Sequence, residues 1–195
     1  HQGKAGAGQH AKMVNQTLIA SNGQSPYTFT ITAGALPNGL TLSKAGGIAG
    51  TPTAVGTFTF TVQAQDAQAN TGSRVYTLRV IYEFTGFLPQ SVNPPALINW
   101  SAGVPLPFVF KLKNTTGLNI LAPNSPASQQ ISCSAPFTPM GNVTVASSNP
   151  LFDLTYQQST TYYVYGWKTN KQWRGTCRQF ILTLNDGTTH PAYVR

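Results

Sequence analysis

The feature that most constrains this sequence is an alternation of apolar residues with threonine or other polar residues, which recurs along its first half. The alternation is clearest in residues 27–32, 57–64 and 74–81. A period of two places one class of side chain on each face of a β-strand, so each run predicts a strand with one buried face. No run in this half shows the period of a helix. The sequence therefore predicts an all-β fold.

Residues typical of turns separate the predicted strands. Glycine and proline are frequent in residues 22–23, 36–39 and 46–52, and a polar loop is expected over residues 66–72. Glycine supplies positive φ angles in such corners, and proline fixes φ beside them. Residues 46–52 are accordingly predicted to form a turn-rich corner. Roughly five to seven short strands in about 80 residues are typical of an Ig-like β-sandwich.

The second half continues with runs rich in apolar and aromatic residues, among them 103–112, 129–133 and 162–169. On a strand, Tyr163, Tyr165 and Trp167 share one face because they lie two residues apart, and we predict that this face is buried. Asn185-Asp186-Gly187 predicts a hairpin turn.

These patterns predict two tandem Ig-like β-sandwich domains, over residues 13–82 and 83–195. No linker rich in glycine, serine or proline separates them, because the strand predicted at residues 74–81 runs almost directly into Glu83. Residues 1–12 show no periodicity. They are expected to be either a flexible lead-in or a strand that pairs with another sheet.

The chain is poor in charge. Charged residues make up 8% of it, against about 25% in typical soluble domains, and Thr, Ser, Gln and Asn take their place. Twelve basic and four acidic residues give a net charge of +8, spread over both halves. Such a surface could attract anionic or carbohydrate surfaces. No nucleic-acid-binding module is recognisable, and the basic residues form only one loose run, at Lys168, Lys171, Arg174 and Arg178. No apolar run of about 20 residues predicts a membrane span.

The two cysteines are Cys133 and Cys177. In a chain of extracellular composition, one disulfide is the natural pairing. It would close a loop of roughly 40 residues and stabilise the fold by about 3–4 kcal/mol. A metal site would need two further ligands, and His1, His10 and His190 lie far apart in the sequence, so no metal is expected.

Catalytic chemistry has few candidates here. The four acidic residues, Asp66, Glu83, Asp153 and Asp186, are not paired in sequence, and His190 is the one histidine within a predicted folded segment. A glycosidase needs two facing carboxylates, and a Ser-His-Asp triad needs an anchored histidine. No glycine-rich loop has the lysine and helix of a phosphate site. We therefore expect neither enzymatic activity nor a cofactor.

Three weaker binding hypotheses remain open. Asp66 with Asn70 is a candidate calcium site, although an Asp in such a loop more often braces its own backbone. Trp100 and Tyr162 are candidates for stacking on a sugar, although the aromatic run of the second half reads first as core. Four sequons would matter only in a host that glycosylates, at Asn15, Asn99, Asn114 and Asn142.

A resemblance to a known family becomes specific in the first half. The segments that carry it are residues 25–29, 33–42, 47–53, 56–62, 64–66 and 76–80. Together they resemble the He-PIG family of bacterial Ig-like domains, almost continuously over residues 14–80. The resemblance implies an extracellular structural module, a kind that is usually repeated, of which this chain has one copy.

The second half is similar to the PxKF family of small sandwich domains at the ends of secreted bacterial proteins, over residues 84–195. Asn93-Pro94-Pro95, Asn99-Trp100 and the segments around both cysteines carry the similarity. The naming motif Pro-x-Lys-Phe departs from the family, because residues 107–110 read Pro-Phe-Val-Phe. The resemblance implies a disulfide between Cys133 and Cys177 and no activity.

These observations predict a non-enzymatic structural module of a bacterial surface or secreted protein, located outside the cell. Its partners would be adjacent domains of the same protein or other copies of itself. Two alternatives stay open. The chain could be a filament subunit whose residues 1–12 pair with an open sheet edge of the next copy. It could also be an adhesive module that binds a glycan or another surface, on a cell or on a virion.

Overall fold

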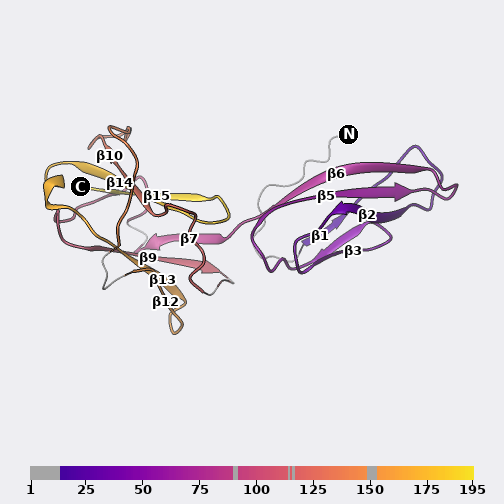
Figure 1. Ribbon diagram of the computed structural model, residues 1–195, viewed down its shortest axis with the longest axis horizontal. Coiled ribbons are helices and arrows are strands. Elements are labelled where there is room, and N and C mark those ends of the chain that lie inside the picture. The colour runs from indigo at the N-terminus through magenta and orange to yellow at the C-terminus, as the bar shows by residue number, and fades with distance from the viewer. Residues whose placement is uncertain (1–13, 90–91, 114, 116, 149–152) are drawn as a thin grey trace. The chain divides into compact units, whose positions relative to one another are not determined.

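The computed structural model describes residues 14–89, 92–113, 115, 117–148 and 153–195. Within these ranges the structure is all β apart from short 3₁₀ turns, and the chain divides between Tyr82 and Glu83 into two compact units (Figure 1). The predicted fold class, two tandem Ig-like β-sandwiches, is confirmed. No helix among the described residues has the length and apolar character to cross a bilayer.

Unit 1, the part of the chain up to Tyr82, contains two antiparallel three-stranded sheets. Their orders are β1-β4-β3 and β2-β5-β6. The strands are β1 (Val14–Thr17), β2 (Thr28–Gly34), β3 (Leu40–Leu42), β4 (Gly47–Gly50), β5 (Gly56–Gln65) and β6 (Thr71–Val80). β5 and β6 pair along their whole length as the long hairpin of Figure 1. Buried side chains from both sheets form one core, at Val14, Phe29, Leu40, Ile48, Phe60 and Val62.

The alternation in the sequence produces this sandwich directly. On β5, Phe60 and Val62 are buried, whereas Thr57 and Thr59 are exposed. Burial of a side chain such as Phe60 stabilises a fold by about 1.5–3 kcal/mol. The threonines lie on the outer face of the sheet, which contacts solvent. On this face the Thr59 hydroxyl lies 3.4 Å from that of Thr77.

The turn predicted over residues 46–52 is wrong in one respect, because it contains the strand β4. This strand is the centre of its sheet and pairs with both β1 and β3. Its glycines permit close approach of neighbouring strands as well as turning. A Cβ on Gly50 (φ +130°) would lie 2.0 Å from the carbonyl oxygen of Gly39. Ile48 lies between the small residues Gly47 and Ala49, and its buried side chain packs the strand against the core.

Unit 2, from Glu83 onward, has a four-stranded and a five-stranded sheet. Their orders are β12-β13-β9-β7 and β11-β10-β14-β15-β8, with a parallel pair between β15 and β8. The elements are β7 (Glu83–Leu88), β8 (Leu97–Ile98), β9 (Leu106–Lys113), β10 (Ala127–Ile131), β11 (Thr144–Val145), β12 (Thr155–Gln157), β13 (Tyr162–Trp167), η2 (Lys171–Trp173), β14 (Cys177–Thr183) and β15 (Thr189–Val194).

Aromatic rings form the core of unit 2. Phe108 of β9 stacks on Phe180 of β14, with ring centroids 4.0 Å apart, and so joins the two sheets. The face predicted for Tyr163, Tyr165 and Trp167 is confirmed, because these residues are 0%, 4% and 1% exposed. The spacing of two between these residues therefore predicts the buried face of β13 independently of the strands that pair with it.

The predicted hairpin at Asn185-Asp186-Gly187 is also confirmed. It joins β14 to β15. The backbone N–H of Leu184 donates to the Thr188 carbonyl, and that of Gly187 donates to the Leu184 carbonyl, both at 2.9 Å. Residues 1–12 and the sequon at Asn114 lie outside the described residues. The other sequon positions, Asn15, Asn99 and Asn142, are exposed.

Candidate functional site

The two cysteines form a disulfide in unit 2. Cys177 begins β14 and is fully buried, and Cys133 lies two residues beyond the end of β10. Their sulfur atoms are 2.06 Å apart, and the residues are separated by 44 positions in sequence. β10 and β14 are neighbours that pair Ile131 with Cys177, so the bond closes the end of this strand pair. Its role is a structural one within the sheet.

Asp66 braces the loop that follows β5. Its Oδ1 accepts hydrogen bonds from the backbone N–H of Gln68 (2.9 Å) and Asn70 (2.8 Å), and its Oδ2 accepts from Gln24 N–H and the Asn70 amide, both at 3.1 Å. The Asn70 amide is the largest cause of a pKa below the usual value for this carboxyl. A carboxylate offers about four lone-pair sites, and N–H donors occupy them. This arrangement favours the loop brace over the calcium site considered for Asp66 and Asn70.

A polar chain runs through the β14–β15 hairpin. Asp186 Oδ1 accepts from the backbone N–H and the hydroxyl of Thr188, and that hydroxyl lies 3.0 Å from His190 Nε2. Because the hydroxyl donates to Asp186, His190 must donate to it and cannot remove its proton. The order Asp–Thr–His is therefore unsuited to nucleophilic catalysis of the triad type. His190 instead stacks on Phe84 of the opposite sheet, at 3.8 Å.

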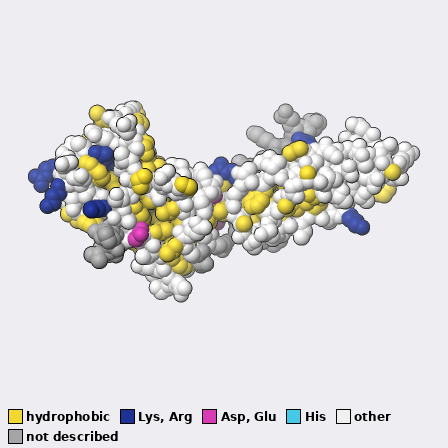
Figure 2. Space-filling model, in the orientation of Figure 1, with side chains coloured by type: hydrophobic (Ala, Val, Ile, Leu, Met, Phe, Trp, Pro, Cys, Tyr) yellow, Lys and Arg dark blue, Asp and Glu magenta, His cyan; other side chains and the backbone are white. Residues whose placement is uncertain are grey.

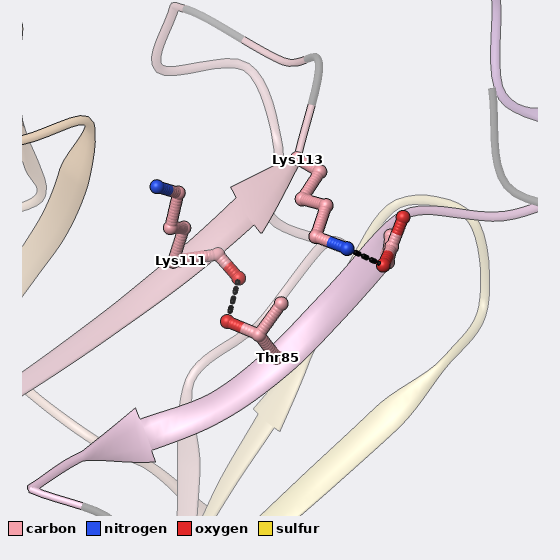
Figure 3. A network of polar contacts seen from close by, with 4 residues as sticks. Thr85, Lys111 and Lys113 are labelled. Carbon is pink, nitrogen blue, oxygen red and sulfur yellow. Dashed lines mark hydrogen bonds and ion pairs between the residues drawn. The ribbon is translucent and has the colours of Figure 1, made fainter.

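The other two carboxylates are also engaged locally. Glu83, the first residue of β7, forms an ion pair with Lys113 at the end of β9 (Figure 3). On the same two strands, the Thr85 hydroxyl donates to the Lys111 carbonyl. Asp153 accepts from the backbone N–H of Leu154. The four carboxylates lie in four different elements or turns. Among the described residues, no group of three or more His, Cys, Asp or Glu side chains gathers where a metal could bind.

Trp100 and Tyr162, the sugar-stacking candidates, do not lie together. The Trp100 indole donates to the Val104 carbonyl, which also accepts from Thr169, a residue just beyond the end of β13. Tyr162 begins β13, with the Lys111 ammonium 5.7 Å from its ring centroid. Trp100 is thus connected through Val104 to the segment that follows the end of β13, whereas Tyr162 lies at the start of that strand. They form no shared platform.

An open groove of about 500 Å³ lies elsewhere in unit 2. One side comes from the edge strand β11 and Ser147, and the other from the segment 168–173 that follows β13. Trp167, the last residue of β13, lines it, together with Trp173 and the exposed Lys168 and Lys171. In the sequence these lysines belong only to the loose basic run that continues to Arg178. The groove itself could not be predicted because its sides are far apart in sequence.

The buried surroundings of this groove are fixed by polar contacts. The Tyr165 hydroxyl donates to the Ala146 carbonyl, just before Ser147. Burial, and to a smaller extent the charge of Asp153, raises the pKa of Tyr165 to about 12, so the phenol keeps its proton. The Trp167 indole N–H, by contrast, has no hydrogen-bond acceptor among the described residues.

The sequence comparison bears on unit 1. Residues 5–81 match the He_PIG family model, described as "Putative Ig domain". This He_PIG match agrees with the resemblance carried by the turn and strand motifs of residues 14–80. It does not extend to unit 2, where the PxKF resemblance stays a prediction. The comparison with curated proteins gives no match.

Solved structures similar to the chain include extracellular modules. "Protocadherin Gamma B2 extracellular cadherin domains 3-6" is 10% identical with a TM-score of 0.34, and the match covers 97% of this chain and 44% of that one. The fibronectin(III)-like modules of Clostridium thermocellum CbhA are 15% identical with a TM-score of 0.30, at 98% and 90% coverage. A Bacteroides ovatus SGBP-B structure in complex with a mixed-linkage heptasaccharide is 14% identical with a TM-score of 0.27, at 94% and 40% coverage. The chain thus spans less than half of the protocadherin chain.

Proposed function

We propose that this chain is a non-enzymatic structural module of a secreted or cell-surface bacterial protein. The observation that carries the proposal is the construction of the chain from two Ig-like units, each with its own core, with only Ile81 and Tyr82 between β6 and β7. Such a chain places two compact sandwiches in series. The disulfide of unit 2 supports a location outside the cytoplasm, because disulfides persist in the oxidising environments found there.

The chemistry of the described residues supports a passive role. Asp66 and Asp186 hold loops, Glu83 pairs with Lys113, and His190 is stacked between the sheets. Catalysis requires such groups to be aimed at a substrate. The same proposal takes residues 84–195 as a PxKF-like domain in which Phe110 keeps its core position, fully buried, although the motif lysine is missing.

A filament subunit is the second candidate, and one observation favours it. β6 is an edge strand of ten residues, and Val75 on it is 62% exposed. A long open edge can accept an added strand from another chain. Residues 1–12 are the proposed donor, as the sequence suggested.

The mass of the native protein distinguishes these roles. For a structural module we expect light scattering to give 20.9 kDa at every concentration, with both units resistant to protease. A mass that grows with concentration, and that returns to the monomer value when residues 1–12 are removed, would contradict the structural module and establish the filament. The Val75→Lys variant is a second check, because a charge on the open edge should block strand addition without disturbing the core.

A further inference from the structure

Strand β6 of unit 1 is the one long and regular sheet edge among the described strands. It pairs with β5 over all ten of its residues, Thr71–Val80, without a register shift. The sheet order β2-β5-β6 gives β6 no second partner strand in the described part of the chain. Such an edge presents a row of backbone N–H and C=O groups to which another strand can bond.

The other sheet edges carry protection that β6 lacks. β2 is interrupted by a register shift between Ile31 and Ala33, and β7 by one between Phe84 and Phe87. The remaining edge strands, β1, β3, β8, β11 and β12, have only two to four residues each. Short strands and bulges discourage pairing with another chain. The fold therefore leaves β6 to be covered in a different way.

The side chains of β6 offer little hindrance to a further strand. Its first five residues, Thr71–Val75, are exposed on both faces of the sheet, and a Cβ on Gly72 would meet no atom within 4 Å. The strand contains no proline, lysine or acidic residue of the kind that guards an open edge. The Arg74 guanidinium lies 5.4 Å from the Tyr76 ring centroid, over the face of its own strand. Figure 2 shows that the visible face of unit 1 is mostly uncharged.

The strand order brings the chain into β1 on the same side of the sandwich as β6. β3, one edge of its sheet, contacts β2, an edge of the facing sheet. β1 is the opposite edge in the order β1-β4-β3, so the facing order β2-β5-β6 places it on the side of β6. Val14, the first residue of β1, accordingly belongs to the core cluster against which Tyr76 and Leu78 of β6 pack.

The segment that leads into β1 has the length that this edge requires. Residues 5–13 lie outside the described residues, yet the match to the He_PIG model begins at residue 5, so these nine residues belong to the family's domain. An extended segment of this length spans roughly 30 Å, at about 3.3 Å per residue, which is close to the length of β6. The segment contains no proline, so each of its backbone N–H groups can take part in a ladder.

We propose that residues 5–13 pair with the open edge of β6 in their own chain and thereby close this edge to other chains. Backbone groups of β6 that point away from β5 then have partners, and the module stays monomeric. The filament candidate uses the same part of the chain on the next copy. The two differ in the sign of one result, because removal of a cap opens β6 and creates association, whereas removal of a donor strand abolishes it.

Hydrogen exchange of the β6 amides in the ¹⁵N-labelled full chain tests the contact directly. Alternate residues of an antiparallel pair bond to the partner strand, so every second β6 amide points to β5 and the others point to the open edge. We expect the edge-facing amides to exchange at least about tenfold faster once residues 1–12 are removed, because they lose their acceptors. The amides bonded to β5 should stay slow, which shows that unit 1 remains folded. Edge-facing amides that already exchange freely in the full chain would overturn the proposal.

The mass of the shortened chain tests the capping role. Light scattering should give 20.9 kDa for the full chain, whereas without residues 1–12 the mass should rise with protein concentration. Val75→Lys in the shortened chain should restore the monomer, because a charge on an open edge opposes pairing. Thr59→Lys is the matched control, since it adds the same charge to an exposed position of β5, which has a partner strand on both sides, and it should leave the association in place.

Three results of this measurement would reject the cap. They are a shortened chain that stays monomeric, an association that Thr59→Lys abolishes as well as Val75→Lys does, and a full chain whose association disappears on shortening. The first result leaves the structural module intact, and the third is the one expected for a filament.

Discussion

At the scale of single residues, two of the four carboxylates of this chain, Asp66 and Asp186, hold backbone turns. Asp66 accepts from three backbone N–H groups and one side-chain amide, and Asp186 accepts from the backbone and hydroxyl of Thr188. Ionised carboxylates accept such bonds strongly. His190, linked to Asp186 through Thr188, is the group in this hairpin whose charge changes near neutral pH.

We expect unit 2 to lose stability when the pH falls from about 7.5 to about 5. Burial of His190 lowers its pKa below the ordinary value of 6.5, and the charge of Asp186 opposes this only in part. The unfolded chain therefore binds more protons just below pH 6.5. Stability is fully present above this value and falls as the pH drops toward the folded pKa. Thermal unfolding measured by near-UV circular dichroism across this range would detect the loss.

His190→Gln provides the control for this titration. Glutamine can still bond to Thr188 but carries no charge, so the melting temperature of unit 2 should become less dependent on pH over the same range. An unchanged pH profile in this variant would assign the effect to another group.

At the scale of elements, β4 shows how a glycine-rich segment can be a central strand. It pairs with β1 on one side and β3 on the other, and its Ile48 enters the core. Gly50 leaves no room for a side chain, because a Cβ there would lie 2.0 Å from the Gly39 carbonyl oxygen. Position 50 needs glycine, because a Cβ there would clash with the backbone of Gly39, the residue before β3.

Gly50→Ala should therefore destabilise unit 1 by at least about 2 kcal/mol. The new Cβ would lie 2.0 Å from the Gly39 carbonyl oxygen, and the φ of +130° is unfavourable for alanine. Denaturant unfolding of the full chain measures the change. Gly72→Ala is the matched control on β6, where a Cβ would have no neighbour within 4 Å. Its effect should stay within about 0.5 kcal/mol, and an equal loss in both variants would contradict the argument.

At the scale of the whole molecule, each unit has a separate core. Unit 1 packs aliphatic and Phe side chains between two small sheets, whereas unit 2 packs a larger aromatic cluster and carries the disulfide. Separate cores allow separate unfolding transitions.

Replacement of both cysteines, Cys133→Ser/Cys177→Ser, should lower the stability of unit 2 by about 3–4 kcal/mol. The bond closes a loop whose ends are 44 residues apart, and its loss enlarges the unfolded ensemble. Calorimetry of the full chain should show this transition move to lower temperature while that of unit 1 stays. A shift of both transitions together would show that the two units unfold as one.

The local sequence determined the class of fold. Alternation of Thr with apolar residues predicted β2, β5 and β6 of unit 1, and the spacing of two between aromatic residues predicted the buried face of β13, because a strand repeats every two residues whatever its partner. Turn chemistry likewise predicted the hairpin at Asn185-Asp186-Gly187. The brace at Asp66 was the favoured reading of its loop, since three of its donors come from Gln68 and Asn70 nearby.

The tertiary structure alone decided the pairings between distant segments. Gly47–Gly50 forms a strand and not a turn because β1 and β3 pair with it from either side in the sheet. Trp100 and Tyr162 were separated by the path of β13. The groove brings Gly103, Thr144 and Lys171 together, and the fourth donor of Asp66 comes from Gln24, 42 residues earlier. Contacts of this kind depend on how two sheets pack, which is a property of the complete core and is not encoded in any short segment.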